Sequence, residues 1–432
     1  MDNIQITKEC SHAGYYDVIV CGGGPAGVCA AIASARQGAK TLLIERNGEL
    51  GGFWTSGLLS WIADVTDKTG VVKEIVDKLR QLGDGREELR DKYYFTADTE
   101  TTKIVFEKMC SDAGVDIRLY TLVTGVVKDN NRITGVVADS KSGCEYFGAG
   151  VVIDATGDGD VGALAGCTYE MGNEQGQTQP MSMIVLVSGI TYDDIEAMYA
   201  SDTNVTKNSW ICNEIRRGGF EPSYVRPLLA PVSKENNLFA LMANHEYGVS
   251  ALSADDLTQA TIHGRAEVYE CVKALRSLGG IWKDIHVVTS APNIGVREGR
   301  RIHGMYRLCR EEDAAKGLSH HDAVCRVTYN MDIHQLSANI RLGEEKWRKG
   351  MSVYPYDIPL RSLISDEVDG LMMAGRCISG DFYTYGNYRV GGNAARTGEA
   401  AGLAAGYSVV NKVELKKMPE IIKDLLEKSD KA

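Results

Sequence analysis

Residues 16–27 read Tyr-Asp-Val-Ile-Val-Cys-Gly-Gly-Gly-Pro-Ala-Gly, and this stretch decides the fold. A short apolar run rich in β-branched residues, 16–21, enters a glycine-rich turn and is followed at once by the alanine-rich residues 30–35. The pattern predicts a strand, a tight turn and a helix. A second strand is expected over residues 40–45 and ends in the acidic Glu45. Together these features predict a βαβ unit of the Rossmann type.

Each residue type in the turn has a physical role in binding a dinucleotide. Gly22 permits the sharp exit from the strand, Gly24 lets a backbone approach a diphosphate, and Gly27 allows close packing of helix on strand. The free N–H groups at the start of the helix then face the diphosphate. Glu45 is placed to accept hydrogen bonds from an adenosine ribose, which NAD and FAD both offer. The predicted contacts of this group also include Pro25, Ala26 and Arg46.

The next part of the chain favours FAD over NAD. Gly51-Gly52 and the small residues 55–57 form a segment where backbone can pass close to a large planar ligand. Residues 115–152 predict several short strands with turns at 129–131 and 141–143, and Val123 within them is a predicted cofactor contact. This region continues into Ala155-Thr156-Gly157.

These motifs resemble those of the two-dinucleotide-binding-domain flavoproteins. Over nearly its whole length the chain is similar to the bacterial FAD-dependent oxidoreductases that are sometimes labelled "xanthan lyase". The further matching segments are 296–302, 332–334, 358–363, 371–379 and 389–390. The resemblance implies a glutathione-reductase-like FAD domain that holds FAD non-covalently, with residues 155–157 beside it. Gly299 replaces the serine usual in the family, so the hydroxyl contact implied there cannot be carried over.

The C-terminal part of the chain is expected to return to the cofactor. The apolar strand 371–374 ends in Gly375-Arg376, which repeats the strand-to-glycine pattern of the N-terminus. The resemblance implies that the following loop runs along the ribityl chain, with Asp381 as a contact; a solvated loop aspartate is the alternative. Gly391-Gly392-Asn393 opens the alanine-rich helix 394–405, whose positive end would stabilise reduced flavin together with Arg389. A purely structural helix is the alternative.

The middle of the chain predicts the substrate site. We expect an α/β protein with an inserted α+β substrate or cap domain, divided as FAD domain 15–175, cap 176–350, returning FAD part 351–412 and C-terminal helix 413–432. Asp332 and His334 share a face if their segment is extended, which suits proton transfer, although a lone histidine is more often structural. Tyr356 is a second candidate for the catalytic proton. Arg297 is assigned to the cofactor; an anionic substrate or surface ion pairing would also explain its basic cluster.

Composition limits the partners. The net charge of −11 disfavours nucleic acid and anionic lipid, and no apolar run predicts a membrane span. Residues 1–16 contain no apolar core of a secretory signal, so a cytoplasmic location is expected. The eleven cysteines contain no C-x-x-C pair, so we expect no metal site, no disulfide framework and mostly buried thiols. The pair His320-His321 is expected at the surface.

The sequence therefore predicts an FAD-dependent oxidoreductase that transfers hydride between a small organic substrate and flavin N5. Its electron donor or acceptor is not identified, and a homo-oligomer is compatible with the sequence. One rival is an NAD-linked dehydrogenase that uses only the N-terminal unit, which leaves the C-terminal glycines unexplained. Another is a flavin-bearing tRNA-modification protein, which the acidic net charge disfavours.

Overall fold

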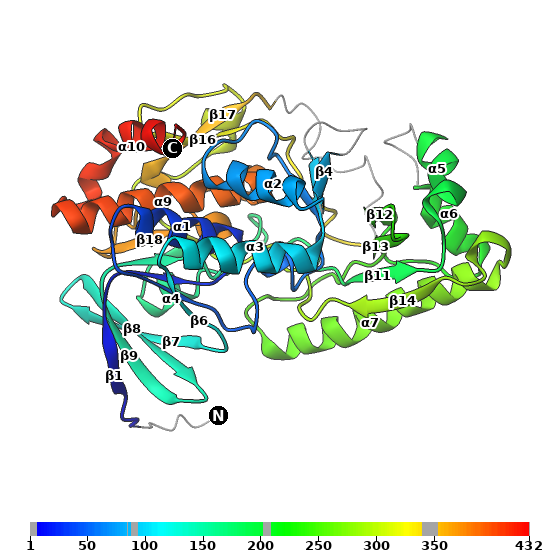
Figure 1. Ribbon diagram of the computed structural model, residues 1–432, viewed down its shortest axis with the longest axis horizontal. Coiled ribbons are helices and arrows are strands. Elements are labelled where there is room, and N and C mark those ends of the chain that lie inside the picture. The colour runs from blue at the N-terminus through cyan, green and yellow to red at the C-terminus, as the bar shows by residue number, and fades with distance from the viewer. Residues whose placement is uncertain (1–6, 84, 88–93, 202–208, 339–352, 432) are drawn as a thin grey trace.

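The main sheet has the strand order β6-β2-β1-β9-β8-β7, with β18 paired to β9 (Figure 1). The computed structural model describes residues 7–83, 85–87, 94–201, 209–338 and 353–431. The strands of this sheet are β1 (Ser11–Cys21), β2 (Thr41–Ile44), β6 (Asp116–Arg118), β7 (Leu122–Asp129), β8 (Arg132–Ser140), β9 (Gly143–Asp154) and β18 (Leu371–Met373). The predicted βαβ unit and the two turns near residues 130 and 142 are confirmed, and so is the α/β fold class.

The sheet changes character along β9. Its carboxyl half lies between β1 and β18, and both neighbours run parallel to it. Its amino half also pairs parallel with β1, but on the other side β8 takes the place of β18 and runs antiparallel. Met373 lies opposite Asp154, and Cys21 lies opposite Asp154 on the other side. The carboxyl ends of three strands from distant parts of the sequence therefore meet at one edge, where ligands of open α/β sheets bind.

Two glycine- and alanine-rich helices pack directly against each other over this sheet. They are α1 (Pro25–Arg36) and α9 (Gly391–Asn411), which lie side by side in Figure 1. A Cβ on Gly398 would lie 2.0 Å from the carbonyl oxygen of Ala26, and one on Gly402 would lie 2.1 Å from that of Ala30. The helices are thus in backbone contact, which no larger residue permits at these two positions.

A second hydrophobic core lies beside the first. It is formed mainly by residues between 183 and 291, including the antiparallel sheet β12-β13-β11-β14. Its elements are β11 (Ile184–Ser188), α5 (Tyr192–Ser201), α6 (Trp210–Arg217), β12 (Leu228–Ser233), β13 (Leu238–Met242), α7 (Ala254–Ser277) and β14 (His286–Ser290). Residues of β16 (Ala323–Val327) and β17 (Tyr356–Pro359) pack into the first core instead. The expected domain limits stay predictions, and the one at 350–351 falls outside the described residues.

The described part of the chain contains further helices and strands. They are β3 (Trp61–Ala63), α2 (Val71–Gln81), β4 (Gly85–Glu87), β5 (Tyr94–Ala97), α3 (Thr99–Asp112), α4 (Asp160–Leu164), β10 (Tyr169–Glu170), β15 (Arg301–Ile302), α8 (Phe382–Tyr388) and α10 (Ile422–Ser429). The expected C-terminal helix starts later than predicted, because a 3-10 turn containing Pro419 precedes α10. None of the helices in the described ranges is long and apolar enough to cross a bilayer.

Two side-chain predictions are corrected. Cys10 and Cys144 form a disulfide, because pairing of Ser11 with Glu145 in β1 and β9 brings their neighbours together. The surface prediction is wrong for His320, whose buried ring places Nε2 2.9 Å from Oδ1 of Asp313. His321 is exposed, as expected.

The contact between α1 and α9 predicts a stability effect. Replacing Gly402 by Ala introduces a methyl group against the α1 backbone and should lower the free energy of unfolding by about 1–3 kcal/mol. Thermal or urea unfolding measures the change. Val410→Ala is the control, because this α9 side chain is 47% exposed and should change stability by less than about 0.5 kcal/mol. Equal stability of Gly402→Ala and the unchanged protein would contradict this packing.

Candidate active site

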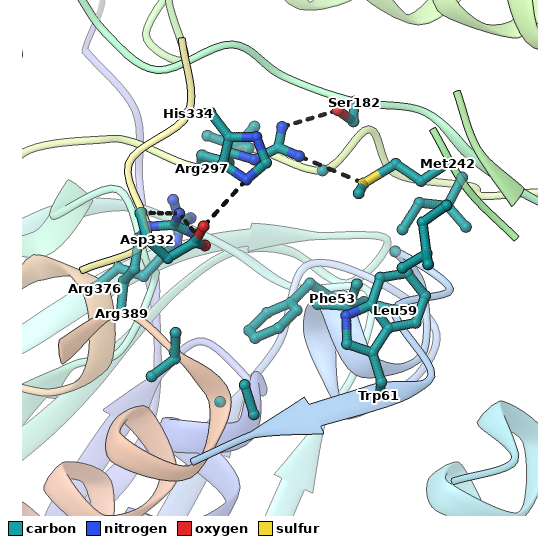
Figure 2. A pocket seen from close by; sticks show the side chains of 18 of the residues that line it. Phe53, Leu59, Trp61, Ser182, Met242, Arg297, Asp332, His334, Arg376 and Arg389 are labelled. Atoms are coloured by element: carbon teal, nitrogen blue, oxygen red, sulfur yellow. Dashed lines mark hydrogen bonds and ion pairs between the residues drawn. The ribbon is translucent and has the colours of Figure 1, made fainter. Parts of the chain in front are cut away.

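Two adjoining cavities lie where the strand ends meet. The turn cavity, of about 140 Å³, borders the glycine-rich turn after β1. The cap cavity, of about 270 Å³, lies between the start of α9 and the second sheet (Figure 2). Phe53, Gly57, Val296 and Arg376 line both cavities. A ligand that filled both would therefore contact the N-terminal turn and the C-terminal helix at once.

Most of the predicted cofactor residues border the turn cavity. They are Gly22, Gly24, Pro25, Ala26, Glu45, Arg46, Gly52, Ala155, Thr156, Gly157, Gly375 and Arg376. Arg297 and Gly391 border the cap cavity, as do the candidate catalytic residues His334 and Arg389. The structure thus brings segments that lie more than three hundred residues apart in the sequence to two adjoining cavities.

The glycines of the turn have the distinct geometries that the motif requires. Gly22 has a φ of +102°, and a Cβ there would lie 2.4 Å from the carbonyl oxygen of Ala155. A Cβ on Gly27 would lie 1.8 Å from the carbonyl oxygen of Gly22, so this residue allows α1 to pack on the turn. Gly24 has an ordinary φ of −68°, and no atom lies within 4 Å of its Cβ position. Gly24 therefore borders open space, which a side chain would narrow.

Glu45 closes one end of the turn cavity. Its Oε2 accepts a hydrogen bond from the N–H of Gly23 at 2.6 Å, and its Oε1 accepts from the backbone and side chain of Asn47 at 2.8 Å. The carboxylate is thereby fixed while it borders the cavity. Asn47 also lines this cavity and was not singled out in the sequence, because an asparagine after a strand is common in turns.

Buried Asp154 shapes the loop of residues 155–157. It accepts hydrogen bonds from the N–H and hydroxyl of Thr156 at 3.1 and 2.7 Å and from the N–H of Gly162 at 2.8 Å. Burial raises the pKa of Asp154 to about 6. Gly157 follows with a φ of +83°, and its Cβ position lies 2.5 Å from Nη2 of Arg376. The loop therefore lies against the arginine that separates the two cavities.

Several predicted cofactor residues lie behind the cavity walls. Gly27 and Gly51 shape the turn, and Gly51 donates its N–H to the carbonyl oxygen of Gly23 at 2.7 Å. Val123 lies in β7 opposite Ala138 and borders neither cavity. Asn393 donates to Oδ2 of Asp64 at 2.9 Å, and a Cβ on Gly392 would lie 1.9 Å from the Asp64 carbonyl oxygen. Gly392 and Asn393 thus fix the first turn of α9.

Asp381 is neither a solvated loop residue nor on the wall of the two cavities. It is buried and caps α8, where its Oδ1 accepts from the N–H groups of Tyr383 and Thr384 at 3.0 and 2.7 Å. Its Oδ2 accepts from the N–H of Arg310 at 2.7 Å. An N-cap aspartate shows the same local pattern as a ligand-binding loop aspartate, so the sequence does not separate the two roles.

Tyr356 is fully buried in the first core and also borders neither cavity. Its hydroxyl donates to the carbonyl oxygen of Thr384 at 3.5 Å. Burial raises the pKa of this hydroxyl well above its ordinary value, so it stays protonated. A role of Tyr356 in proton transfer stays a prediction that no contact with the cap cavity supports.

The candidate proton-transfer group borders the cap cavity as a connected set. His334 Nε2 lies 3.5 Å from Oδ1 of Asp332, and Asp332 Oδ2 accepts from Nη2 of Arg389 at 2.7 Å (Figure 2). His334 Nδ1 lies 3.2 Å from Nε2 of His245. The ring of Tyr224 stacks on His245 with centroids 3.9 Å apart. The spacing of Asp332 and His334 in the sequence predicted that they lie together. No local sequence pattern predicted that His245 and Tyr224 join them.

His245 is held in its neutral form. Burial lowers its pKa well below the usual value, and the nearby Arg297 and His334 lower it further. A neutral imidazole has one donor and one acceptor nitrogen. Since Nδ1 lies 3.0 Å from the hydroxyl of Tyr247, the two contacts of His245 join Tyr247 to His334.

Comparison with known proteins places the chain in a family. A family model described as FAD dependent oxidoreductase matches residues 17–428. The chain belongs to this family. It is a flavoenzyme with a Rossmann-type fold, and its cofactor is FAD. The match includes the C-terminal return, which the rival NAD-linked dehydrogenase left unexplained.

Individual relatives share parts of the chain. A thiamine thiazole synthase of Methanococcus vannielii is 30% identical over 174 residues, which are 36% of this chain and 64% of that protein. A digeranylgeranylglycerophospholipid reductase of Methanocella arvoryzae is 30% identical over 173 residues, 35% of this chain and 42% of that protein. The chain thus spans less than two thirds of these curated relatives. The crystal structure of p-nitrophenol 4-monooxygenase PnpA from Pseudomonas putida DLL-E4 has a similar fold, with a TM-score of 0.50 at 11% identity over 97% of this chain and 87% of that one.

The described residues fit FAD. Gly24 offers a backbone N-terminal to α1 with open space beside it, which suits a diphosphate. Two buried donor atoms, Nη1 of Arg376 and Nε1 of Trp54, have no hydrogen-bond partner within the described part of the chain. Arg376 borders both cavities, and Trp54 Nε1 lies 2.8 Å from the Cβ position of Gly391. Arg376 therefore has a donor available where the two cavities adjoin, and Trp54 has one beside the start of α9.

Gly24 gives a direct test of the turn cavity. Its backbone conformation suits alanine and its Cβ position is open, so Gly24→Ala should leave the stability of the FAD-free protein unchanged. The added methyl group should weaken FAD binding at least about tenfold, because the backbone can no longer approach the diphosphate. Fluorescence titration with FAD measures the affinity. The matched Gly27→Ala should instead destabilise the FAD-free protein, and equal FAD affinity of Gly24→Ala and the unchanged protein would remove Gly24 from the site.

The depressed pKa of His245 predicts a pH effect on stability. Below about pH 6.5 His245 takes up a proton in the unfolded chain but not in the folded protein. The contribution of His245 to the free energy of unfolding is therefore fully present above this pH and is lost as the pH falls. Uptake of one such proton lowers the free energy of unfolding by at most about 1.4 kcal/mol per pH unit. Urea unfolding between pH 7 and pH 5 should show a smaller loss for His245→Gln than for the unchanged protein. Exposed His12→Gln is the control, and parallel profiles for all three proteins would refute the neutral state of His245.

Proposed function

We propose that the cap cavity binds a small organic substrate and that His334 transfers a proton to or from it. The observation that carries this proposal is that the two cavities share four lining residues, with His334, Asp332 and Arg389 together on the wall of the second one. Bound FAD supplies a centre that accepts or donates hydride. The chain contributes the substrate pocket, the exclusion of bulk water and the proton.

His334 is suited to proton transfer by its neighbours. Neutral His245 contacts Nδ1, and Asp332, which Arg389 fixes, lies 3.5 Å from Nε2, longer than a hydrogen bond. Nε2 is therefore the nitrogen that exchanges the proton with the substrate. A third cavity, of about 130 Å³, borders His245 and shares Tyr224, Asp332 and His334 with the cap cavity. His334 therefore borders a substrate space and a second space through which a proton can exchange. Asp332 and His245 act as positioning residues in this proposal.

The start of α9 supports the chemistry of the cofactor. Val390 is the N-cap of this helix and offers no side-chain acceptor to the free N–H groups of the first turn. Gly391 borders the cap cavity. The positive end of α9 and the guanidinium of Arg389 favour negative charge at this place. This supports the predicted role of Arg389 and the helix start in stabilising reduced flavin.

The substrate classes of the relatives are not assigned to this chain. Their names point to unlike substrates, thiazole precursors and digeranylgeranyl lipids, and each shares only about a third of the chain. A cytoplasmic location remains a prediction of the sequence, which is also compatible with a homo-oligomer and does not identify the electron donor or acceptor.

The cofactor and substrate are tested together. The purified protein should show a flavin absorbance spectrum or acquire one with added FAD, and a colourless protein that FAD does not reconstitute would contradict the proposal. Anaerobic screening of sugars, polyols, hydroxy acids and unsaturated acids should identify compounds that change the flavin spectrum. Compounds that bleach oxidised flavin are substrates for reduction of the enzyme, and those that reoxidise reduced flavin act in the other direction.

Once a substrate is found, His334→Gln tests the proton transfer. Its flavin half-reaction should be slower by about 10²–10⁴-fold, because a positioned acid or base is lost. Stopped-flow absorbance across pH 5–9 measures the rate. His286→Gln, an exposed position on β14, should retain the original rate. Rates that His334→Gln leaves unchanged at every pH would exclude this histidine.

A further inference from the structure

The cap cavity carries an excess of fixed positive charge. Three arginines and a single aspartate are among its lining residues: Arg297, Arg376, Arg389 and Asp332. Arg376 pairs with Asp158 at 2.9 Å and Arg389 pairs with Asp332 at 2.7 Å. Arg297 makes no ion pair with any acid in the described ranges. The positive charge left over in this cavity is therefore that of Arg297.

Arg297 is anchored on the second sheet. Its Nη1 donates to the carbonyl oxygen of Pro180 at 2.7 Å and to the hydroxyl of Ser182 at 2.9 Å, and its Nη2 lies 3.4 Å from the sulfur of Met242 (Figure 2). These are neutral acceptors, so they orient the guanidinium without neutralising it. Burial and the charge of Arg389 lower the pKa of Arg297 to about 10, which leaves it charged at neutral pH.

Further buried donors lack acceptors, one on Arg389 of this wall and one on Gln179, which contacts Arg389 and His334. Gln179 is buried, and its Oε1 accepts from the N–H of His334 at 3.1 Å and from Nη2 of Arg389 at 3.4 Å. Its Nε2, like Nε of Arg389, has no hydrogen-bond partner among residues that the structure describes. Buried donors without acceptors are costly, and a charged group without a counter-ion more so. These unpaired donors and the charge of Arg297 therefore favour a ligand with negatively charged acceptor atoms.

The opposite wall is apolar. Phe53, Leu59 and Trp61 gather there, with Met242 between them and Arg297 in Figure 2. A ligand that satisfied both walls would have an anionic end and an apolar body. The phosphate groups of FAD do not meet this description, because the turn cavity at the other end of the space has the geometry for them.

We propose that the substrate of this enzyme is a small carboxylic acid, with its carboxylate paired to Arg297 and its apolar part against Phe53, Leu59 and Trp61. A carboxylate matches the planar guanidinium of Arg297 in two parallel hydrogen bonds. His334 lies on the same wall, so the proton it transfers belongs to a carbon or oxygen close to the carboxylate. This inference deepens the proposed function and rests on it.

Binding tests the inference without turnover. The FAD-loaded protein is titrated with benzoate, 3-phenylpropionate, hexanoate and crotonate, and with benzamide, benzyl alcohol, chloride and inorganic phosphate at equal ionic strength. Difference absorbance of the flavin and the thermal midpoint report binding. At least one organic acid should bind saturably and at least tenfold more tightly than its uncharged analogue. Equal affinity of amide and acid, binding of chloride or phosphate as tight as any acid, or no saturable binding of any acid would overturn the carboxylate assignment.

Variants of Arg297 test whether its guanidinium binds the carboxylate of the acid. Arg297→Gln should weaken binding of the acid by about 10- to 100-fold, because one charge-assisted pair is lost. Binding of the uncharged benzamide should stay unchanged. Arg297→Lys keeps the charge but not the paired geometry and should bind with intermediate affinity. The control is Arg300→Gln, since Arg300 pairs with Asp160 at 2.9 Å and does not line the cap cavity.

The variants also separate the two proposals. FAD content and the thermal midpoint show whether each variant is folded, and Arg297→Lys provides the test if Arg297→Gln does not fold. Equal acid affinity of a folded Arg297 variant and Arg300→Gln would overturn the role of Arg297. The proposed function fails instead if acids bind but no compound changes the redox state of the flavin, or if His334→Gln reacts at the original rate.

Discussion

The contact between the backbones of α1 and α9 is the constraint on which the rest of the structure depends. Gly398 and Gly402 place α9 directly on the carbonyl groups of α1, and Ala26 and Ala30 are the residues they meet. Because α1 begins at the first glycine-rich turn and α9 begins at Gly391, their close packing fixes the distance between two binding segments from opposite ends of the chain. The joined cavities follow from this packing and from β18, which adds the C-terminal strand beside β9.

The sequence predicted the cofactor side of the molecule well because its determinants are local. A strand that ends in glycines and continues into a helix is typical of a dinucleotide-binding turn. Gly22 and Gly27 have the close packing expected of them, and Gly24 borders open space. The antiparallel strands β7, β8 and β9 were also recognisable, since their turns lie at Asn130 and Gly143, both with positive φ.

Residues whose roles depend on distant partners were harder to predict. Asp381 has the sequence context of a loop ligand, yet its carboxylate caps α8 and fixes the N–H of Arg310. Tyr356 was a candidate for the catalytic proton, but it lies in β17, which pairs with β16, and its ring is buried in the first core. His245 follows a strand of the second sheet and meets His334 across 89 positions of sequence, a contact that no local pattern encodes.

The two halves of the site are built by different means, and this difference has a functional consequence. The turn cavity is shaped by backbone, at positions such as Gly22 and Gly375 where a Cβ would meet a neighbour at less than 3 Å, so its form tolerates little change. The far wall of the cap cavity is shaped by the side chains of Arg297, Ser182 and Met242, which rest on a separate hydrophobic core. Substitutions there alter charge and shape without moving α1 or α9. Cofactor binding and substrate choice are therefore separable properties of this fold, joined only at residues such as Arg376 and Phe53 that border both spaces.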